Sequence, residues 1–108
     1  MPENITLRTP ITFEGETVSA LTLDLEGLTG ADLINAEQAV ITASPMPRTS
    51  VNAMYQDYQA VVGAKAAGKP VELIHALKAR DFNEVCVRVQ GFLLGMDSES
   101  DPGEPSES

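Results

Sequence analysis

The sequence predicts one small α+β domain: an N-terminal antiparallel β-hairpin, then three or four α-helices, then a disordered acidic tail. Two observations predict this order. Apolar residues alternate with Thr and Ser in the first quarter of the chain, and they recur at helical spacing from residue 29 onward. Strands and helices are thus segregated, which is typical of the α+β class. The length of 108 residues suits a single domain over 1–95 and a tail over 96–108.

Residues 5–25 predict two antiparallel strands. The turn between them is Glu14–Glu16, because its glycine can take a positive φ. Pro10 has no N–H to donate, so we expect it at the start or an edge of the first strand, which residues 5–7 would extend. The alternation changes phase near Ala20, which a β-bulge would explain. A lone hairpin is marginally stable, so its apolar face should pack on the helices or on a second copy.

The first helix should begin at Thr29, which with Asp32 three residues later forms an acidic version of the capping box. Its end should come before Pro45 and Pro47. Four apolar residues then share one face of this helix: Leu33, Ala36, Val40 and Ile41.

A second helix should start after a cap at Thr49 or Ser50, and we expect Gly63 and Gly68 to loosen its end. Its apolar stripe consists of Val51, Met54, Tyr55, Tyr58, Val61 and Val62. Pro70 suits the first position of a short third helix. The apolar residues of that helix are Val71, Leu73, Ile74 and Leu77.

The final helix is predicted over residues 82–94, with Asp81 as its N-cap and Gly95 as its stop. Six apolar residues follow the spacing of one helical face: Phe82, Val85, Cys86, Val89, Phe92 and Leu93. This stripe carries no reactive groups, so it indicates packing or partner binding rather than catalysis.

The charge of the chain is unevenly distributed. Its formal net charge is −9, and residues 96–108 contribute five acids and no base. Residues 1–95 hold eleven acids and seven bases, a net of −4. An acidic surface repels phosphates, which argues against nucleic-acid and anionic-membrane partners and favours a basic partner or simple solubility. We expect an intracellular protein, because no signal peptide and no membrane-spanning apolar run is visible.

Few residues could support catalysis. Neither a nucleophile nor an orienting acid lies near His75 in the sequence, so it is expected to be a structural or surface residue. The single cysteine, Cys86, cannot form an internal disulfide, and its place on the apolar stripe indicates a packed thiol. Asp97–Asp101 resembles a calcium loop only faintly, since it lacks the central glycine and the terminal acid. We therefore expect no catalytic site, no cofactor and no metal; a small enzyme using His75 and Cys86 is a minor alternative.

Two apolar groups are candidates for partner binding. Met54, Tyr55 and Tyr58 could line the core, or they could form a partner surface, where Tyr and Met are enriched. Phe92–Leu94 are three consecutive large apolar residues that span more than half a helical turn. One core contact cannot cover all three, so we expect Leu94 or one of its neighbours in an oligomer or partner contact.

Three segments resemble the small tail-assembly chaperones of contractile-tailed bacteriophages, the E-type and Mu-type proteins. ITLRTPITFEGETVSALTLDL is similar to that family's two strands around a charged glycine turn. LTGADLINAE resembles its loop leading into a first helix that contains DL, and LKARDFNEVCVRVQGFLLG resembles its terminal helix. The resemblance covers most of residues 4–95, and residues 45–69 match the family pattern least well.

The resemblance implies a non-enzymatic role. Members of this family bind the long helical tape-measure protein, keep it soluble until tube subunits displace them, and are absent from the finished virion. The implied partners are the tape-measure protein, further copies of the chain, and a longer version of it made by ribosomal frameshifting. The implied location is the host bacterial cytoplasm. The alternative is an acidic DNA-mimic or anti-restriction protein, although five of the sixteen acids lie in the tail rather than in ordered rows.

Overall fold

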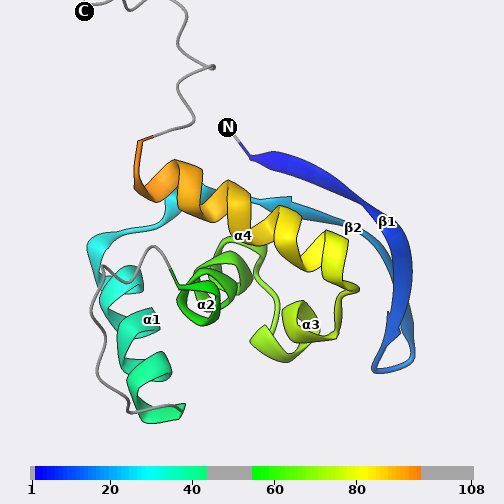
Figure 1. The fold of residues 1–108 in the computed structure, drawn as a ribbon, viewed down its shortest axis with the longest axis horizontal. Coiled ribbons are helices and arrows are strands. Elements are labelled where there is room, and N and C mark those ends of the chain that lie inside the picture. Colours follow the sequence, from blue (N-terminus) through cyan, green and yellow to red (C-terminus); the bar gives the residue numbers. More distant parts are fainter. Residues whose placement is uncertain (1, 44–54, 96–108) are drawn as a thin grey trace, which may run out of the picture.

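A computed structural model describes residues 2–43 and 55–95, and it confirms a hairpin followed by helices (Figure 1). The predicted tail at 96–108 and the segment 44–54 lie outside the described residues. A short 3₁₀ turn, η1, joins the sheet to the first helix. The elements are β1 (Glu3–Phe13), β2 (Glu16–Leu23), η1 (Leu25–Gly27), α1 (Gly30–Ala43), α2 (Gln56–Ala67), α3 (Val71–Ala76) and α4 (Ala79–Leu93).

The hairpin turn lies where the sequence predicts it. Phe13 pairs with Glu16, which leaves a two-residue loop of Glu14 and Gly15. Their φ angles are +50° and +83°. Positive φ at both central residues is the requirement of a type I′ turn, whose twist matches that of the two strands.

The predicted irregularity of the hairpin is confirmed, and its extra residues lie on β1. Thr6 pairs with Ala20 and Ile11 pairs with Val18, so residues 7–10 of β1 face the single residue Ser19 of β2. Pro10 belongs to this wide bulge, where a residue without an N–H breaks no ladder hydrogen bond. Residues 7–10 of β1 therefore have no regular one-to-one pairing with β2.

The capping box of α1 is confirmed. Oδ2 of Asp32 accepts a hydrogen bond from the N–H of Thr29 at 2.9 Å, and Oγ1 of Thr29 accepts one from the N–H of Asp32 at 3.3 Å. Ala36 and Val40 face the core as expected, but Ile41 is 50% exposed, so its assignment to the buried face was wrong. It lies one residue beyond Val40, which turns it about 100° away from the core.

Helix α2 lies at the centre of the domain and contacts α1, α3, α4 and β2 (Figure 1). The structure corrects the expectation for Gly63, which lies inside the helix instead of loosening its end. A Cβ atom at this position would lie 2.7 Å from Cγ1 of Val85 on α4, so glycine permits the two helices to approach closely. Gly68 ends the helix in the left-handed conformation, with φ +68°.

The boundaries of α2 and α3 differ slightly from those predicted. The caps proposed at Thr49 and Ser50 lie outside the described residues, and the described helix begins at Gln56 after Tyr55. Pro70 is the N-cap of α3, one residue before the predicted first helical position. Its fixed φ suits either place, because neither position needs an N–H donor.

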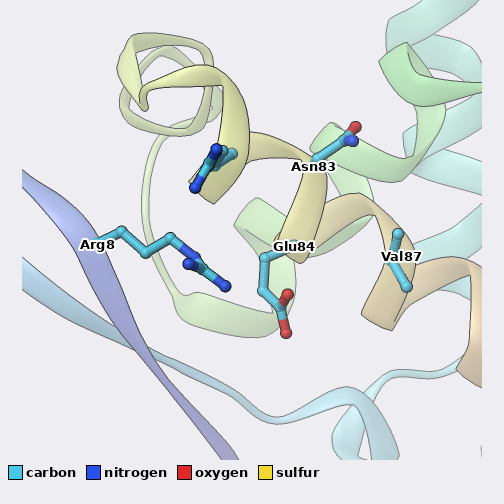
Figure 2. Close-up of a pocket in the computed structure, with 5 residues that line it drawn as sticks. Arg8, Asn83, Glu84 and Val87 are labelled. Atoms are coloured by element: carbon cyan, nitrogen blue, oxygen red, sulfur yellow. The ribbon is translucent and has the colours of Figure 1, made fainter.

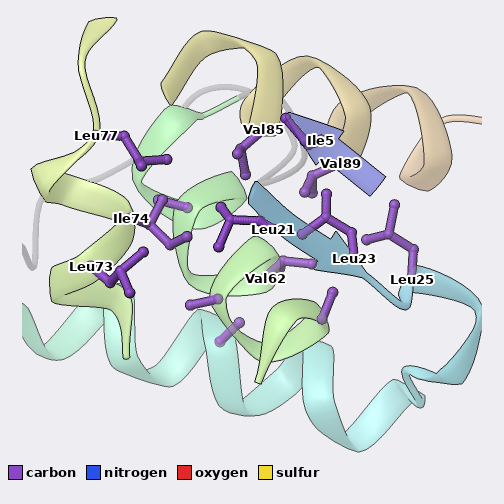
Figure 3. Close-up of a cluster of buried hydrophobic side chains, with 14 of the residues drawn as sticks. Ile5, Leu21, Leu23, Leu25, Val62, Leu73, Ile74, Leu77, Val85 and Val89 are labelled. Carbon is purple, nitrogen blue, oxygen red and sulfur yellow. The ribbon is translucent and has the colours of Figure 1, made fainter. Parts of the chain in front are cut away.

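The core forms where both strands meet α2, α3 and α4 (Figure 3). The hairpin therefore packs on the helices of its own chain, which was one of the two alternatives left open by the sequence. The largest fully buried side chains of the core come from β2 and three helices: Leu21, Leu23, Val62, Ile74, Val85 and Val89.

Gly63→Ala should destabilise the domain relative to Gly91→Ala. Both substitutions gain about 0.5–1 kcal/mol of helix stability, because alanine restricts the unfolded chain. Only the first also forces its Cβ against Val85, and overpacking costs typically about 1–3 kcal/mol. Urea unfolding of both variants measures the difference, and equal midpoints would contradict the close approach of α2 and α4.

Candidate functional site

A buried carboxylate joins α4 to β1. Asp81 is 2% exposed; its Oδ1 accepts a hydrogen bond from the N–H of Arg8 at 2.9 Å, and its Oδ2 accepts one from the N–H of Thr9 at 3.0 Å. These two donors belong to the bulge, where the regular pairing with β2 is interrupted. Two charge-assisted bonds compensate for the burial of the carboxylate.

This contact corrects the predicted start of the last helix. The helix begins at Ala79 with Lys78 as its N-cap, so Asp81 lies in the first turn and caps nothing. The N–H of Phe82 is bonded to the carbonyl of Lys78 at 2.8 Å, as in a continuing helix. The carboxylate is therefore available to the strand rather than to its own helix.

A second link between β1 and α4 is an ion-pair cluster. Nη1 of Arg88 lies 2.7 Å from Oε1 of Glu3, and its Nε lies 2.8 Å from Oε2 of Glu84. The hydrogen bonds that Arg88 donates to Glu84 and Glu3 raise the pKa of its guanidinium. All three side chains are more than a third exposed, so solvent screening leaves the cluster a small contribution to stability.

Two adjoining pockets lie between β1 and α4. The larger, of about 310 Å³, is lined by Arg8, Arg80, Asn83, Glu84 and Val87. Figure 2 shows the side chain of Arg8 reaching from the strand toward Glu84 on the helix. The smaller pocket, of about 180 Å³, shares Arg8 and Glu84 and also contacts Asp81 and Arg88. The lining offers guanidinium donors and two carboxylates, Glu84 and Asp81, and both carboxylates already accept hydrogen bonds.

The residues predicted for partner binding are divided between the core and the surface. Tyr58 is buried, and its hydroxyl donates to the carbonyl of Leu33 at 3.4 Å. Burial, and then the nearby carboxylate of Glu37, raise the pKa of Tyr58. Tyr55, Phe92 and Leu93 are half-buried against the core.

Leu94 is the most accessible of the predicted partner-binding residues that the structure describes, with 39% of its surface exposed. Met54 lies outside the described residues. Three consecutive residues of a helix cannot all face the core, and in this triplet Phe92 and Leu93 pack inward while Leu94 faces solvent. Contact of Leu94 with a partner stays a prediction.

Other exposed apolar residues were not predicted as a partner surface. Val87 on α4 is 61% exposed and lies seven residues before Leu94, while Ile34 on α1 is 58% exposed and lies seven residues before Ile41. Residues seven apart lie nearly on the same side of a helix. Helix α1, and helix α4 together with its C-cap Leu94, each present a pair of apolar side chains to solvent. Heptad spacing was the signal that could have found them.

Comparison with known families matches residues 4–94 to the phage tail assembly chaperone proteins, described as E, or 41 or 14. The chain belongs to this family. The match runs from β1 through α4, so it includes the hairpin, both strand-to-helix contacts and the outer side of α4. Neither the curated proteins nor the solved structures contained a match to the chain.

The two residues considered for catalysis, His75 and Cys86, lie in different environments. His75 is exposed on α3, while Cys86 is 2% exposed and its Sγ lies 3.9 Å from the carbonyl oxygen of Gln56. Burial raises the pKa of the Cys86 thiol to about 11. A protonated, packed thiol is a poor nucleophile.

Two further features are absent from residues 2–43 and 55–95. No group of three or more His, Cys, Asp or Glu side chains in these ranges could hold a metal ion. No helix there has both the length and the apolar character needed to cross a membrane.

Asp81→Asn should lower the free energy of unfolding by about 1–3 kcal/mol, the typical cost of leaving a buried hydrogen-bonding group unsatisfied. An amide offers only one acceptor oxygen, so one of the two strand N–H groups loses its partner. Urea unfolding measures the effect, with Glu72→Gln, at an exposed position of α3, as the control for losing one negative charge. Equal stabilities of the two variants would contradict the anchoring role.

Cys86 should react with a thiol reagent only when the domain unfolds. At pH 8, a pKa of about 11 leaves roughly a thousandth of the thiol ionised, against about a quarter at the unperturbed pKa of about 8.5. We expect at least a hundredfold faster labelling in concentrated urea than in buffer. Similar rates would show that the thiol is accessible in the folded protein.

Proposed function

We propose that the chain binds the tape-measure protein of its phage and keeps it soluble until the tail tube assembles around it. The action takes place in the host bacterial cytoplasm, and the chain is absent from the mature virion. Membership of the tail-assembly chaperone family supports a role in assembly. The observation that carries the finer proposal is the exposed apolar pair Val87 and Leu94, on the outer side of a helix whose inner side is buried.

The partner in this proposal is a long helical protein with apolar stripes. A long helical protein that has not yet assembled exposes apolar stripes, and it aggregates unless another surface covers them. Several copies of the chain can each cover part of such a stripe with a short amphipathic face, and they can dissociate from it later. The net charge of −9 then keeps the complex in solution. This role needs no catalytic group and no cofactor, and the charge disfavours nucleic acid and membranes as partners.

Self-association is part of the proposal. Ile34 and Ile41 leave an apolar pair exposed on α1, which contacts α2 on its inner side. This face is separate from the outer face of α4, so copies could contact one another while each holds the same partner. A longer, frameshifted version of the chain would contain the same domain and join the same assembly.

The proposal predicts a soluble, multi-copy complex when the chain is co-expressed with the tape-measure protein encoded nearby. Size-exclusion chromatography with light scattering measures the mass of the complex and of the chain alone. The tape-measure protein should be insoluble without the chain and soluble with it. An insoluble tape-measure protein in both cases, or a chain that elutes alone, would sink the proposal.

A further inference from the structure

Helix α4 carries a second stripe, on the side away from the core. Its residues are separated by four, three, four and three positions, and they are Arg80, Glu84, Val87, Gly91 and the C-cap residue Leu94. This is the heptad spacing at which one helix packs along another. The buried residues Val85, Cys86 and Val89 lie on the opposite side of the helix.

The C-terminal half of the outer stripe is apolar and has a gap. Val87 and Leu94 are 61% and 39% exposed. A Cβ atom built on Gly91 between them would meet nothing within 4 Å. The open space at Gly91, between these two exposed side chains, suits the insertion of an apolar side chain from a partner helix.

The N-terminal half of the stripe is next to a positively charged pocket. Arg8 and Arg80 line the pocket of about 310 Å³, and neither guanidinium has an ion-pair partner among residues 2–43 and 55–95. The neighbouring carboxylates are engaged, because Glu84 binds Arg88 and Asp81 accepts the N–H groups of β1. Two unpaired guanidiniums in an acidic protein favour a carboxylate from outside.

We propose that the outer stripe of α4 binds one amphipathic helix of the tape-measure protein, with a Glu or Asp side chain of that helix in the Arg8–Arg80 pocket. The proposal rests on the proposed function and names the surface that performs it. Arg80 and Val87 are about 10 Å apart along the helix axis. The bound segment should therefore carry an apolar stripe with an acidic residue about two helical turns from an apolar one.

The steric test uses two matched substitutions in the full chain. Gly91→Gln fills the open space at this position of α4, whereas Ala39→Gln places the same side chain on an exposed position of α1. Both proteins should fold, since the added atoms at residue 91 enter open space. Isothermal titration calorimetry with overlapping tape-measure peptides should show at least about tenfold weaker binding for Gly91→Gln and unchanged binding for Ala39→Gln.

The charge test is a double-mutant cycle. The paired substitutions Arg8→Ala and Arg80→Ala should weaken binding of the best peptide about tenfold or more, while the backbone N–H of residue 8 still reaches Asp81. Replacing the acidic residues of that peptide by amides should cause a similar loss with the unchanged chain and little further loss with the double variant.

The outcomes separate the two proposals. If the tape-measure protein binds the unchanged chain and all variants equally well, the α4 surface is wrong and the chaperone function stands. If neither the full-length tape-measure protein nor any peptide binds the unchanged chain, the proposed function itself fails. If Gly91→Gln changes the mass of the chain alone in light scattering, a second copy occupies the stripe, and the proposed occupant is overturned.

Discussion

The domain depends on one buried carboxylate that holds the first strand to the last helix. Asp81 accepts hydrogen bonds from two consecutive N–H groups of β1, at Arg8 and Thr9, where the hairpin ladder is interrupted. Without an acceptor there, the bulge would leave backbone donors unsatisfied beside the core. The contact fixes how far β1 lies from α4, and so it also defines the pockets between them.

A second constraint is the small size of the side chains in the central helix. Helix α2 is surrounded by α1, α3, α4 and β2, and alanine and glycine occupy much of its buried surface. Close approach at Gly63 lets valines from α4 pack directly against the helix backbone. A core without tryptophan can be densely packed in this way, because the helices lie close enough for short side chains to fill the space between them.

Local patterns predicted much of the fold. The capping box of Thr29 and Asp32, the glycine turn at Glu14–Glu16 and the apolar stripe of the last helix each depend on residues close together in sequence, and each was identified correctly. The structure also confirms the α+β class, which was predicted from the same local patterns. Asp81 was misassigned because a cap and a long-range acceptor look identical in sequence. Its true partners lie more than seventy residues away, at a bulge whose available N–H groups no periodicity reveals.

The candidate site was harder to predict than the fold. Leu94 was predicted as a contact residue because three consecutive apolar residues cannot all face one core, and the structure shows that it is exposed. Val87 was overlooked because the inner apolar stripe was sufficient to predict the helix, so a second stripe was not sought. The pocket at Arg8 and Arg80 joins residues from opposite ends of the domain, and only the assembled structure brings them together.

The link between β1 and α4 also governs the order of events during synthesis. Asp81 and Arg88 contact residues that the ribosome makes first, at separations of 73 and 85 positions. A hairpin alone is marginally stable, and contacts between distant parts of a chain form late. The domain therefore closes only after nearly all of it has been translated. Until then, the strand exposes its bulge and apolar face, so the helper protein is itself briefly vulnerable to aggregation.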